Sequence, residues 1–198
     1  MNLANPSRRD FLTFSGAALL AGAAVAAIPL TGCKLSLQDL ENYIPVALNA
    51  VAGIVTVLQA AGVIPPGVAS IINTVKVGLD DLLTAIQDSA PAGSIVGRIE
   101  LVIQALQGFV ANLSLPATVD AVVTGLVDVI LSTLMAFENA LTPSPTTAAP
   151  RTFKVGARAI LVRPKMRTNR AFKRDYNAIA VAGGYPGIAL KMTFWERL

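Results

Sequence analysis

The chain contains no histidine and only one cysteine among its 198 residues. General acid–base catalysis relies most often on histidine, and without it no Ser–His–Asp or Cys–His arrangement can form. A lone cysteine cannot make an intrachain disulfide, and few of the usual zinc ligands are present. The adjacent Asp80 and Asp81 would project about 100° apart on a helix, so they do not form a facing carboxylate pair. We therefore expect a protein that is not an enzyme and that holds neither a metal ion nor a cofactor.

The first 32 residues have the layout of an export signal. A short polar segment carries Arg8 and Arg9, and residues 11–30 follow it without a charge. A basic start, an apolar stretch and an end of small residues are typical of a signal peptide. About 20 apolar residues would also suffice to span a bilayer, so an N-terminal transmembrane anchor is the alternative. We predict that residues 1–32 are an export signal and not part of the folded domain.

A short pattern around the paired arginines resembles the twin-arginine export motif of bacteria. The positions of this chain that match the motif are Arg8, Arg9, Phe11 and Leu12. Thr13 stands where that family often has lysine, so the general secretion route is the alternative. The resemblance implies that the chain leaves the cytoplasm.

The single cysteine ends a second pattern, which resembles the lipobox of bacterial lipoproteins. This pattern consists of Leu30, Thr31, Gly32 and Cys33. In that family the cysteine sulfur is diacylated and the signal is cut just before it. The resemblance therefore implies that Cys33 carries lipid and begins the mature chain. Two or three acyl chains give stable anchoring, whereas a single chain binds membranes weakly.

Charge divides the rest of the chain into two segments of opposite sign. Residues 34–142 carry three basic and nine acidic side chains, a net charge of −6, and residues 151–198 carry eleven and two, a net charge of +9. Between them, residues 142–152 (TPSPTTAAPRT) have the composition of a semi-extended linker. We predict a helical bundle over residues 33–141, a linker over 142–152, and a basic module over 153–198.

The acidic segment predicts four helices, because breaker-rich stretches near residues 62–67, 89–93 and 114–116 divide it into four parts. Two of the parts, residues 68–86 and 95–113, repeat apolar side chains at three-and-four spacing, as amphipathic helices do. The fold class is therefore mainly α, with a four-helix bundle-like module.

The other two parts, residues 43–64 and 118–141, are apolar nearly all round. Such a helix is buried, membrane-bound or covered by a partner. Three explanations compete for the surplus apolar surface. The bundle could have mildly apolar Ala and Gly exteriors, it could form a homo-oligomer or bind a protein partner, or it could present a lipid-facing or ligand-enclosing surface.

The basic module predicts a small α+β appendage with the order strand, helix, strand. Residues 153–161 alternate with a period of two, which indicates a strand whose inward side chains include Phe153 and Leu161. Asn169 could cap a helix that runs to Ala182, and residues 188–194 alternate again. Fewer than 50 residues are too few for independent stability, so we expect this module to pack on the helices or on a partner.

Six cations lie within twelve positions of the basic module and form what we call the basic cluster. Its members are Arg163, Lys165, Arg167, Arg170, Lys173 and Arg174. A cluster of this kind attracts phosphate-bearing surfaces. Three interpretations are open: a solvated face, a site for anionic lipid headgroups or acidic envelope polymers, and pairing with the acidic helices. Export makes nucleic acid an unsuitable partner.

These patterns predict an exported, lipid-anchored protein of the bacterial cell envelope, on the periplasmic or extracytoplasmic side, with a binding or scaffolding role. A carrier that holds a hydrophobic ligand between apolar helices is one alternative. An accessory subunit of an exported enzyme complex is another. Lys34 follows the cysteine, where aspartate would indicate inner-membrane retention in some bacteria, so either membrane is compatible with the sequence.

Overall fold

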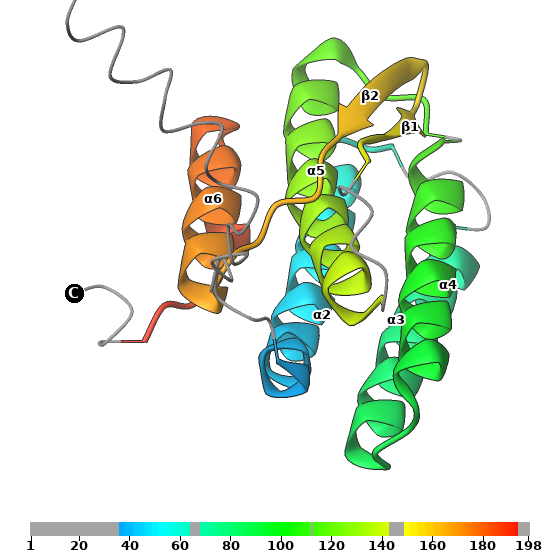
Figure 1. Cartoon of the computed structure of the whole chain (residues 1–198). Coiled ribbons are helices and arrows are strands. Elements are labelled where there is room, and N and C mark those ends of the chain that lie inside the picture. The colour runs from blue at the N-terminus through cyan, green and yellow to red at the C-terminus, as the bar shows by residue number, and fades with distance from the viewer. Residues whose placement is uncertain (1–35, 64–67, 112, 143–148, 194–198) are drawn as a thin grey trace, which may run out of the picture. The chain divides into compact units, whose positions relative to one another are not determined.

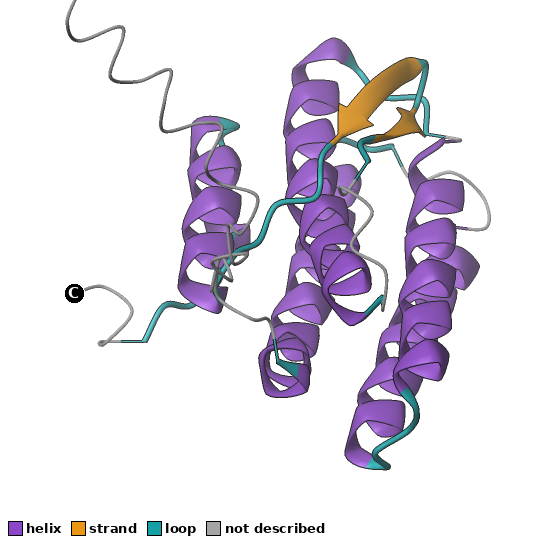
Figure 2. Cartoon of the chain, viewed as in Figure 1, coloured by secondary structure: helices purple, strands orange, loops and turns teal. Residues whose placement is uncertain are grey.

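Four long helices follow one another along the acidic segment, as the sequence predicts. They are α2 (Leu37–Ala60), α3 (Val68–Gln87), α4 (Ala92–Ala111) and α5 (Ala117–Leu141). Three shorter elements follow: strands β1 (Arg151–Val155) and β2 (Arg158–Val162) and helix α6 (Asn169–Ala182), before a 3-10 turn at Pro186–Ile188. This computed structural model describes residues 36–63, 68–111, 113–142 and 149–193 (Figure 1). The mainly α fold class with a small C-terminal β element is confirmed (Figure 2).

The start of α2 is fixed by a capping box. The Ser36 hydroxyl oxygen accepts a hydrogen bond from the backbone N–H of Asp39 at 3.1 Å, and the Asp39 carboxylate accepts one from the Ser36 N–H at 2.9 Å. These two bonds satisfy backbone donors that the first turn of a helix otherwise leaves unpaired. The hydrogen bonds lower the pKa of Asp39, although its slight burial raises it. The N-cap of α2 thus follows Cys33 by three residues in the sequence.

The four helices pack as a closed group. Helix α2 contacts α3 and α5, and α4 also contacts α3 and α5, so each helix has two neighbours (Figure 1). The inward stripes of the amphipathic helices are buried, including Leu79 and Leu82 of α3 and Ile99 and Leu106 of α4. A four-helix bundle is therefore the core of the fold.

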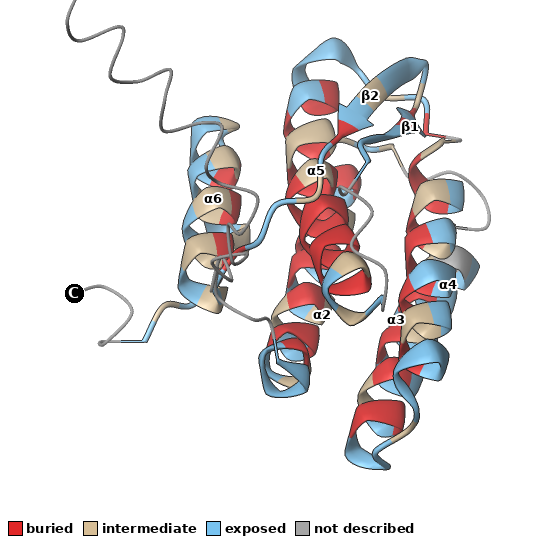
Figure 3. Ribbon diagram, in the orientation of Figure 1, coloured by how far each residue is buried: buried red, intermediate tan, exposed pale blue. Residues whose placement is uncertain are grey.

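The C-terminal segment covers the surplus apolar surface of α5. This helix contacts α6 and β2 in addition to α2 and α4, and every residue from position 129 to position 138 is buried (Figure 3). Side chains from the hairpin and from α6, such as Phe153, Val162 and Phe172, belong to the same apolar core as the four helices. The all-round apolar character of α5 is thus explained within one chain, because surrounding elements lie on every side of its central turns.

The strand predicted over residues 153–161 is instead a hairpin. Strands β1 and β2 pair antiparallel, with Phe153 opposite Ile160, and the turn between them uses Gly156 at a φ of 57°. The Gly156 N–H donates to the Val110 carbonyl oxygen at 2.7 Å, which ties the turn to the end of α4. The alternation along residues 153–161 does not show this reversal, because apolar residues at 157, 159 and 161 continue it in the sequence although the inward face changes phase at the two-residue turn.

The helix predicted over residues 169–182 is confirmed, with Thr168 instead of Asn169 as its N-cap. The second strand predicted over residues 188–194 is wrong for its described part, which ends a 3-10 turn at Ile188 and has no regular secondary structure from 189 to 193. The side chain of Asn177 bonds both the N–H and the carbonyl oxygen of Leu190, at 2.7 and 3.0 Å. The Asn177 amide thus satisfies the backbone groups of Leu190 that a neighbouring strand would otherwise bind. Arg151 and Thr152, which were assigned to the linker, already belong to β1.

Candidate functional site

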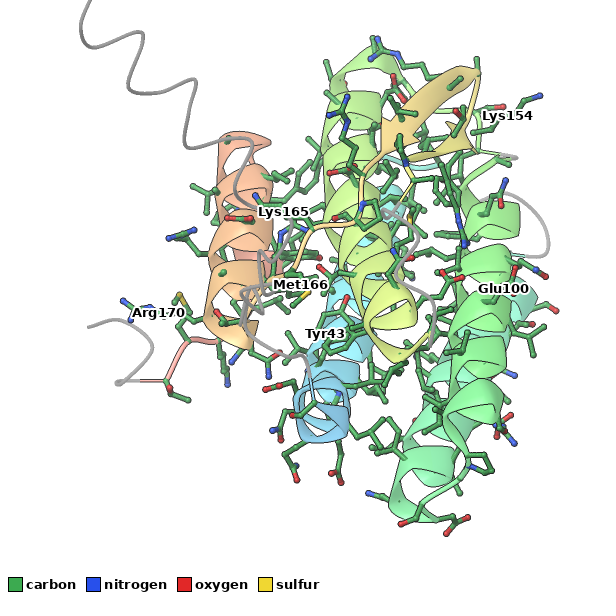
Figure 4. All side chains as sticks on the ribbon, in the orientation of Figure 1. Tyr43, Glu100, Lys154, Lys165, Met166 and Arg170 are labelled. Carbon is green, nitrogen blue, oxygen red and sulfur yellow. The ribbon has the colours of Figure 1, made fainter. Side chains whose placement is uncertain are left out.

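The structure divides the basic cluster into an exposed set and a buried cation. Arg163, Lys165, Arg170 and Arg174 are exposed, Lys173 is half-buried, and the side chain of Arg167 is only 5% exposed. Figure 4 labels Lys165 and Arg170. The six cations lie close together because they belong to one short stretch of chain, the segment between β2 and α6 and the first turns of α6. Residues 163–167 follow β2 without regular secondary structure, and residues 170–174 lie on the first turns of α6, where positions four apart share a face.

Arg167 joins α5 to α6 through a buried polar network. Its Nε donates to the Asp175 carboxylate at 3.0 Å, and its Nη1 donates to the hydroxyl oxygens of Ser132 at 2.5 Å and Thr133 at 3.3 Å. Burial raises the pKa of Asp175. The hydrogen bond from Arg167 and the charges of Lys165 and Arg167 lower that pKa by more than burial raises it, so the net shift is downward. Arg167 is therefore largely occupied by bonds within the protein that hold α6 on the bundle.

The segment that carries the exposed cations is pinned to α5. The backbone N–H of Lys165 donates to the Ser132 carbonyl oxygen at 2.9 Å, and the Lys165 ammonium lies 3.4 Å from the Asp175 carboxylate. The side chains of Lys165 and Arg174 nevertheless remain 62% and 73% exposed. Solvent-exposed charges of this kind gain little from ion pairing, so they keep most of their attraction for an external anion.

A depression of about 370 Å³ lies beside this segment. It is lined by Asp128, Ser132, Leu161, Arg163, Pro164, Lys165 and Arg167. Burial raises the pKa of Asp128, and the positive charges of Arg167 and Lys165 oppose that shift without cancelling it. The wall of the depression therefore combines cationic side chains, the apolar Leu161 and Pro164, and Asp128, whose charged form is disfavoured by burial.

Two exposed apolar side chains lie among the cations, and the sequence did not predict them. Leu161 is 56% exposed and Met166 is 48% exposed. Leu161 had been assigned to the inward face of a strand, but the hairpin turn changes the phase, so that Val162 is buried instead. A shift of one residue moves every side chain of a strand to the opposite face. Cations interleaved with exposed apolar side chains are typical of surfaces that bind at a membrane interface.

Other cations of the basic segment pair with acids of α5. Arg151 lies 2.6 Å from the Glu138 carboxylate, and Arg158 lies 2.8 Å from the Asp120 carboxylate. Both acids are buried, so these ion pairs tie the hairpin to the bundle. Pairing with the acidic helices therefore occurs, and it uses cations that mostly lie outside the basic cluster.

Two further depressions are open to solvent. One, of about 530 Å³, lies between the polar strip of α2 and residues 187–191, and its lining includes Asn49, Thr56 and Lys173. The other, of about 720 Å³, lies between the α4–α5 connection and the hairpin, where Asp120 and Arg158 form part of its wall. Within the described ranges, His, Cys, Asp and Glu side chains form no group of three or more that could hold a metal ion.

Within the part of the chain that the structure describes, three helices are long and apolar enough to cross a membrane, judged by length and composition. They are Leu37–Ala60, Ala92–Ala111 and Ala117–Leu141. The most apolar of them, α5, is also the one most enclosed by the rest of the chain. The residues of the predicted signal and lipobox, Arg8, Arg9, Phe11, Leu12 and residues 30–33, lie outside the described ranges.

Comparisons of the chain with models of protein families, with curated proteins and with solved structures give no match. The function proposed below therefore rests on the chemistry and placement of the chain's own residues.

Proposed function

We propose that this chain is an exported protein, held by lipid on Cys33 at the extracytoplasmic side of a bacterial envelope membrane, that binds an anionic, phosphate-bearing surface of that envelope. The observation that carries the binding role is the exposed set of Arg163, Lys165, Arg170 and Arg174. These four side chains are exposed to solvent, whereas Arg167 is buried and hydrogen-bonded within the protein. A scaffold tethered at a membrane would use such a face to hold its orientation or to bring a partner to the surface.

The binding energy expected from four exposed cations is enough for a protein that is already anchored to the membrane. Each Lys or Arg near an anionic membrane surface contributes about 1 kcal/mol, so four give a weak site when the domain is free in solution. A lipid anchor makes the second contact intramolecular, which raises its effective concentration without new interactions. The attraction extends over a Debye length, about 8 Å at physiological ionic strength, so the site acts only close to the surface.

The carrier alternative gains no support from the described part of the chain. Drug-sized hydrophobic ligands are held in concave sites that bury most of their surface. The apolar faces of α2 and α5 pack instead against other elements, and the three depressions above are open and lined in part by charged or polar groups. We therefore propose binding at a surface and not transport of a ligand.

Lipid attachment can be tested by metabolic labelling with a fatty-acid analogue. We expect the wild-type chain to be labelled and to partition with detergent-phase lipoproteins, and Cys33→Ser to lose both properties. Equal labelling of the two forms would refute attachment at Cys33.

Surface binding can be tested with residues 34–198, because residues 35–198 form a compact unit of their own. We expect this form to sediment with vesicles that contain anionic lipid, to do so less at high salt, and to ignore neutral vesicles. Replacing Arg163, Arg170 and Arg174 with glutamine should abolish sedimentation. A control with the same change in net charge replaces the exposed Lys76, Lys154 and Lys191 with glutamine and should retain it. Equal losses in the two triple variants would show that net charge alone, and not this face, drives binding.

A further inference from the structure

We infer that the end of the domain at which α2 begins faces the bilayer, that Met166 and Arg170 form the contact, and that the turn of the β1–β2 hairpin lies on the far side. This orientation rests on the proposed lipid attachment at Cys33 and specifies the partner of the basic face as the anionic bilayer itself.

The covalent tether is the first step. Ser36, the N-cap of α2, follows Cys33 by three residues. A fully extended chain spans at most about 3.3–3.6 Å per residue, so the start of α2 lies within about 11 Å of the acylated cysteine. A tether this short excludes orientations in which the opposite end of the domain touches the membrane and α2 begins far from it.

The contacts of α2 show which other elements share this end. The Asn169 side chain, at the start of α6, donates to the Asn42 carbonyl oxygen at 3.1 Å. Gln87, at the end of α3, donates to the Glu41 carboxylate at 3.3 Å. The ring of Phe137, near the end of α5, lies 5.5 Å from that of Tyr43. The tethered end therefore carries the start of α6 together with the ends of α3 and α5.

The turn of the hairpin lies at the far end of α4. Helix α4 begins next to the end of α3 and runs for 20 residues, which is about 30 Å at 1.5 Å per residue. The hairpin turn is bonded to Val110 at the far end of that helix. Lys154 of β1, two residues before Gly156 at that turn, is thus more than a Debye length from the tethered end and gains little from an anionic bilayer there (Figure 4).

The two sides of the tethered end differ in charge. The α3 side carries the exposed Asp88, which directly follows α3, and Glu41 of α2, to which Gln87 donates, whereas the α6 side carries Arg170 and the half-exposed Met166. An anionic bilayer repels the first side and attracts the second. Hydrocarbon also accepts the Met166 side chain, which an acidic polymer without apolar groups would leave in water. The domain therefore leans on the bilayer with its α6 side.

Site-specific quenching tests this orientation on the complete lipidated chain in anionic vesicles. The only native cysteine carries the lipid, so an introduced cysteine is the only free thiol. Three exposed positions receive a fluorophore in separate variants: Met166→Cys on the α6 side, Asp88→Cys on the α3 side, and Lys154→Cys on the hairpin. A nitroxide on the lipid headgroups serves as the quencher. We expect strong quenching at position 166, weaker quenching at 88 and almost none at 154. In neutral vesicles the difference between 166 and 88 should shrink while 154 stays unquenched.

Two results would overturn the orientation. One is quenching at position 154 equal to that at position 166, and the other is stronger quenching at 88 than at 166 in anionic vesicles. Either result leaves fatty-acid labelling at Cys33 intact, so it is distinguishable from a failure of the proposed lipid attachment. Circular dichroism of each variant checks that the labelled chain keeps its helices.

Discussion

The hydroxyl group of Tyr176 on α6 occupies the space that a side chain at Gly53 on α2 would need. It donates a hydrogen bond to the Ala50 carbonyl oxygen at 2.9 Å, and a Cβ atom built at position 53 would overlap the hydroxyl oxygen. The two helices can approach this closely only because position 53 is glycine. Burial of the hydroxyl raises the pKa of Tyr176, so the group is a neutral donor at physiological pH.

Gly53→Ala should therefore destabilise the domain, by about 1–3 kcal/mol, as overpacking of a well-packed core does. Gly97→Ala is the matched control, because its added Cβ meets nothing within 4 Å, and it should stabilise α4 by about 0.5–1 kcal/mol. Tyr176→Phe removes the hydroxyl and opens space, so Gly53→Ala should cost less in that background. Chemical denaturation of the wild type, Gly53→Ala, Tyr176→Phe and the double variant measures the coupling energy between the two positions. Strict additivity would show that residues 53 and 176 do not meet.

Arg167→Gln should destabilise the domain far more than Arg170→Gln. Breaking a buried ion pair by removing one partner costs about 3–5 kcal/mol, and we expect about 3 kcal/mol here because Asp175 keeps Lys165 as a neighbour. The exposed Arg170 should contribute less than about 0.5 kcal/mol. Thermal unfolding followed by circular dichroism gives both values, and similar melting temperatures for the two variants would contradict the buried role of Arg167.

The effect of Arg167→Gln should also depend on pH. The folded-state pKa of Asp175 lies below its unfolded value, so its ion pair contributes stability above the unfolded pKa and loses it as the pH falls through the folded pKa. The difference between wild type and Arg167→Gln should therefore be largest near neutral pH and shrink in acid. A difference independent of pH would mean that the charge of Asp175 plays no part.

Asp128→Asn should stabilise the domain at neutral pH. Burial raises the pKa of Asp128 in the folded protein, against the opposing charges of Arg167 and Lys165. The folded state then binds the proton more tightly than the unfolded state, and stability falls as the pH rises through the unfolded and then the folded pKa. Asparagine removes this cost. The gain in melting temperature should vanish below the ordinary carboxylate pKa, and a gain that persisted there would point to packing instead of charge.

Replacing Arg8 and Arg9 together with lysine should stop export. The change keeps both positive charges but removes the guanidinium groups, which lysine does not replace at sites that recognise arginine. We expect unprocessed precursor to accumulate in the cytoplasm, as detected by fractionation and immunoblotting. Normal processing of this variant would instead assign the chain to the general secretion route.

Local pattern was enough to predict the helices. The three-and-four spacing of the segments around residues 68–86 and 95–113 predicts α3 and α4, because a helix buries one stripe. The charge reversal after residue 142 also marked the segment that holds the exposed cations. These features depend on neighbours along the chain, which sequence shows directly.

Tertiary contacts decided the rest. The period-two pattern of residues 153–161 hid a turn at Gly156 whose position is set by a bond to Val110, and that turn exposed Leu161. The six cations of the basic cluster could not be told apart by sequence, but in the fold Ser132, Thr133 and Asp175 bind one of them, Arg167. The apolar surplus of α5 was visible in the sequence, but what covers it was not. Contacts between elements join residues that are far apart in the chain. The local periodicity of a segment shows which of its faces is apolar, but not which other segment covers that face.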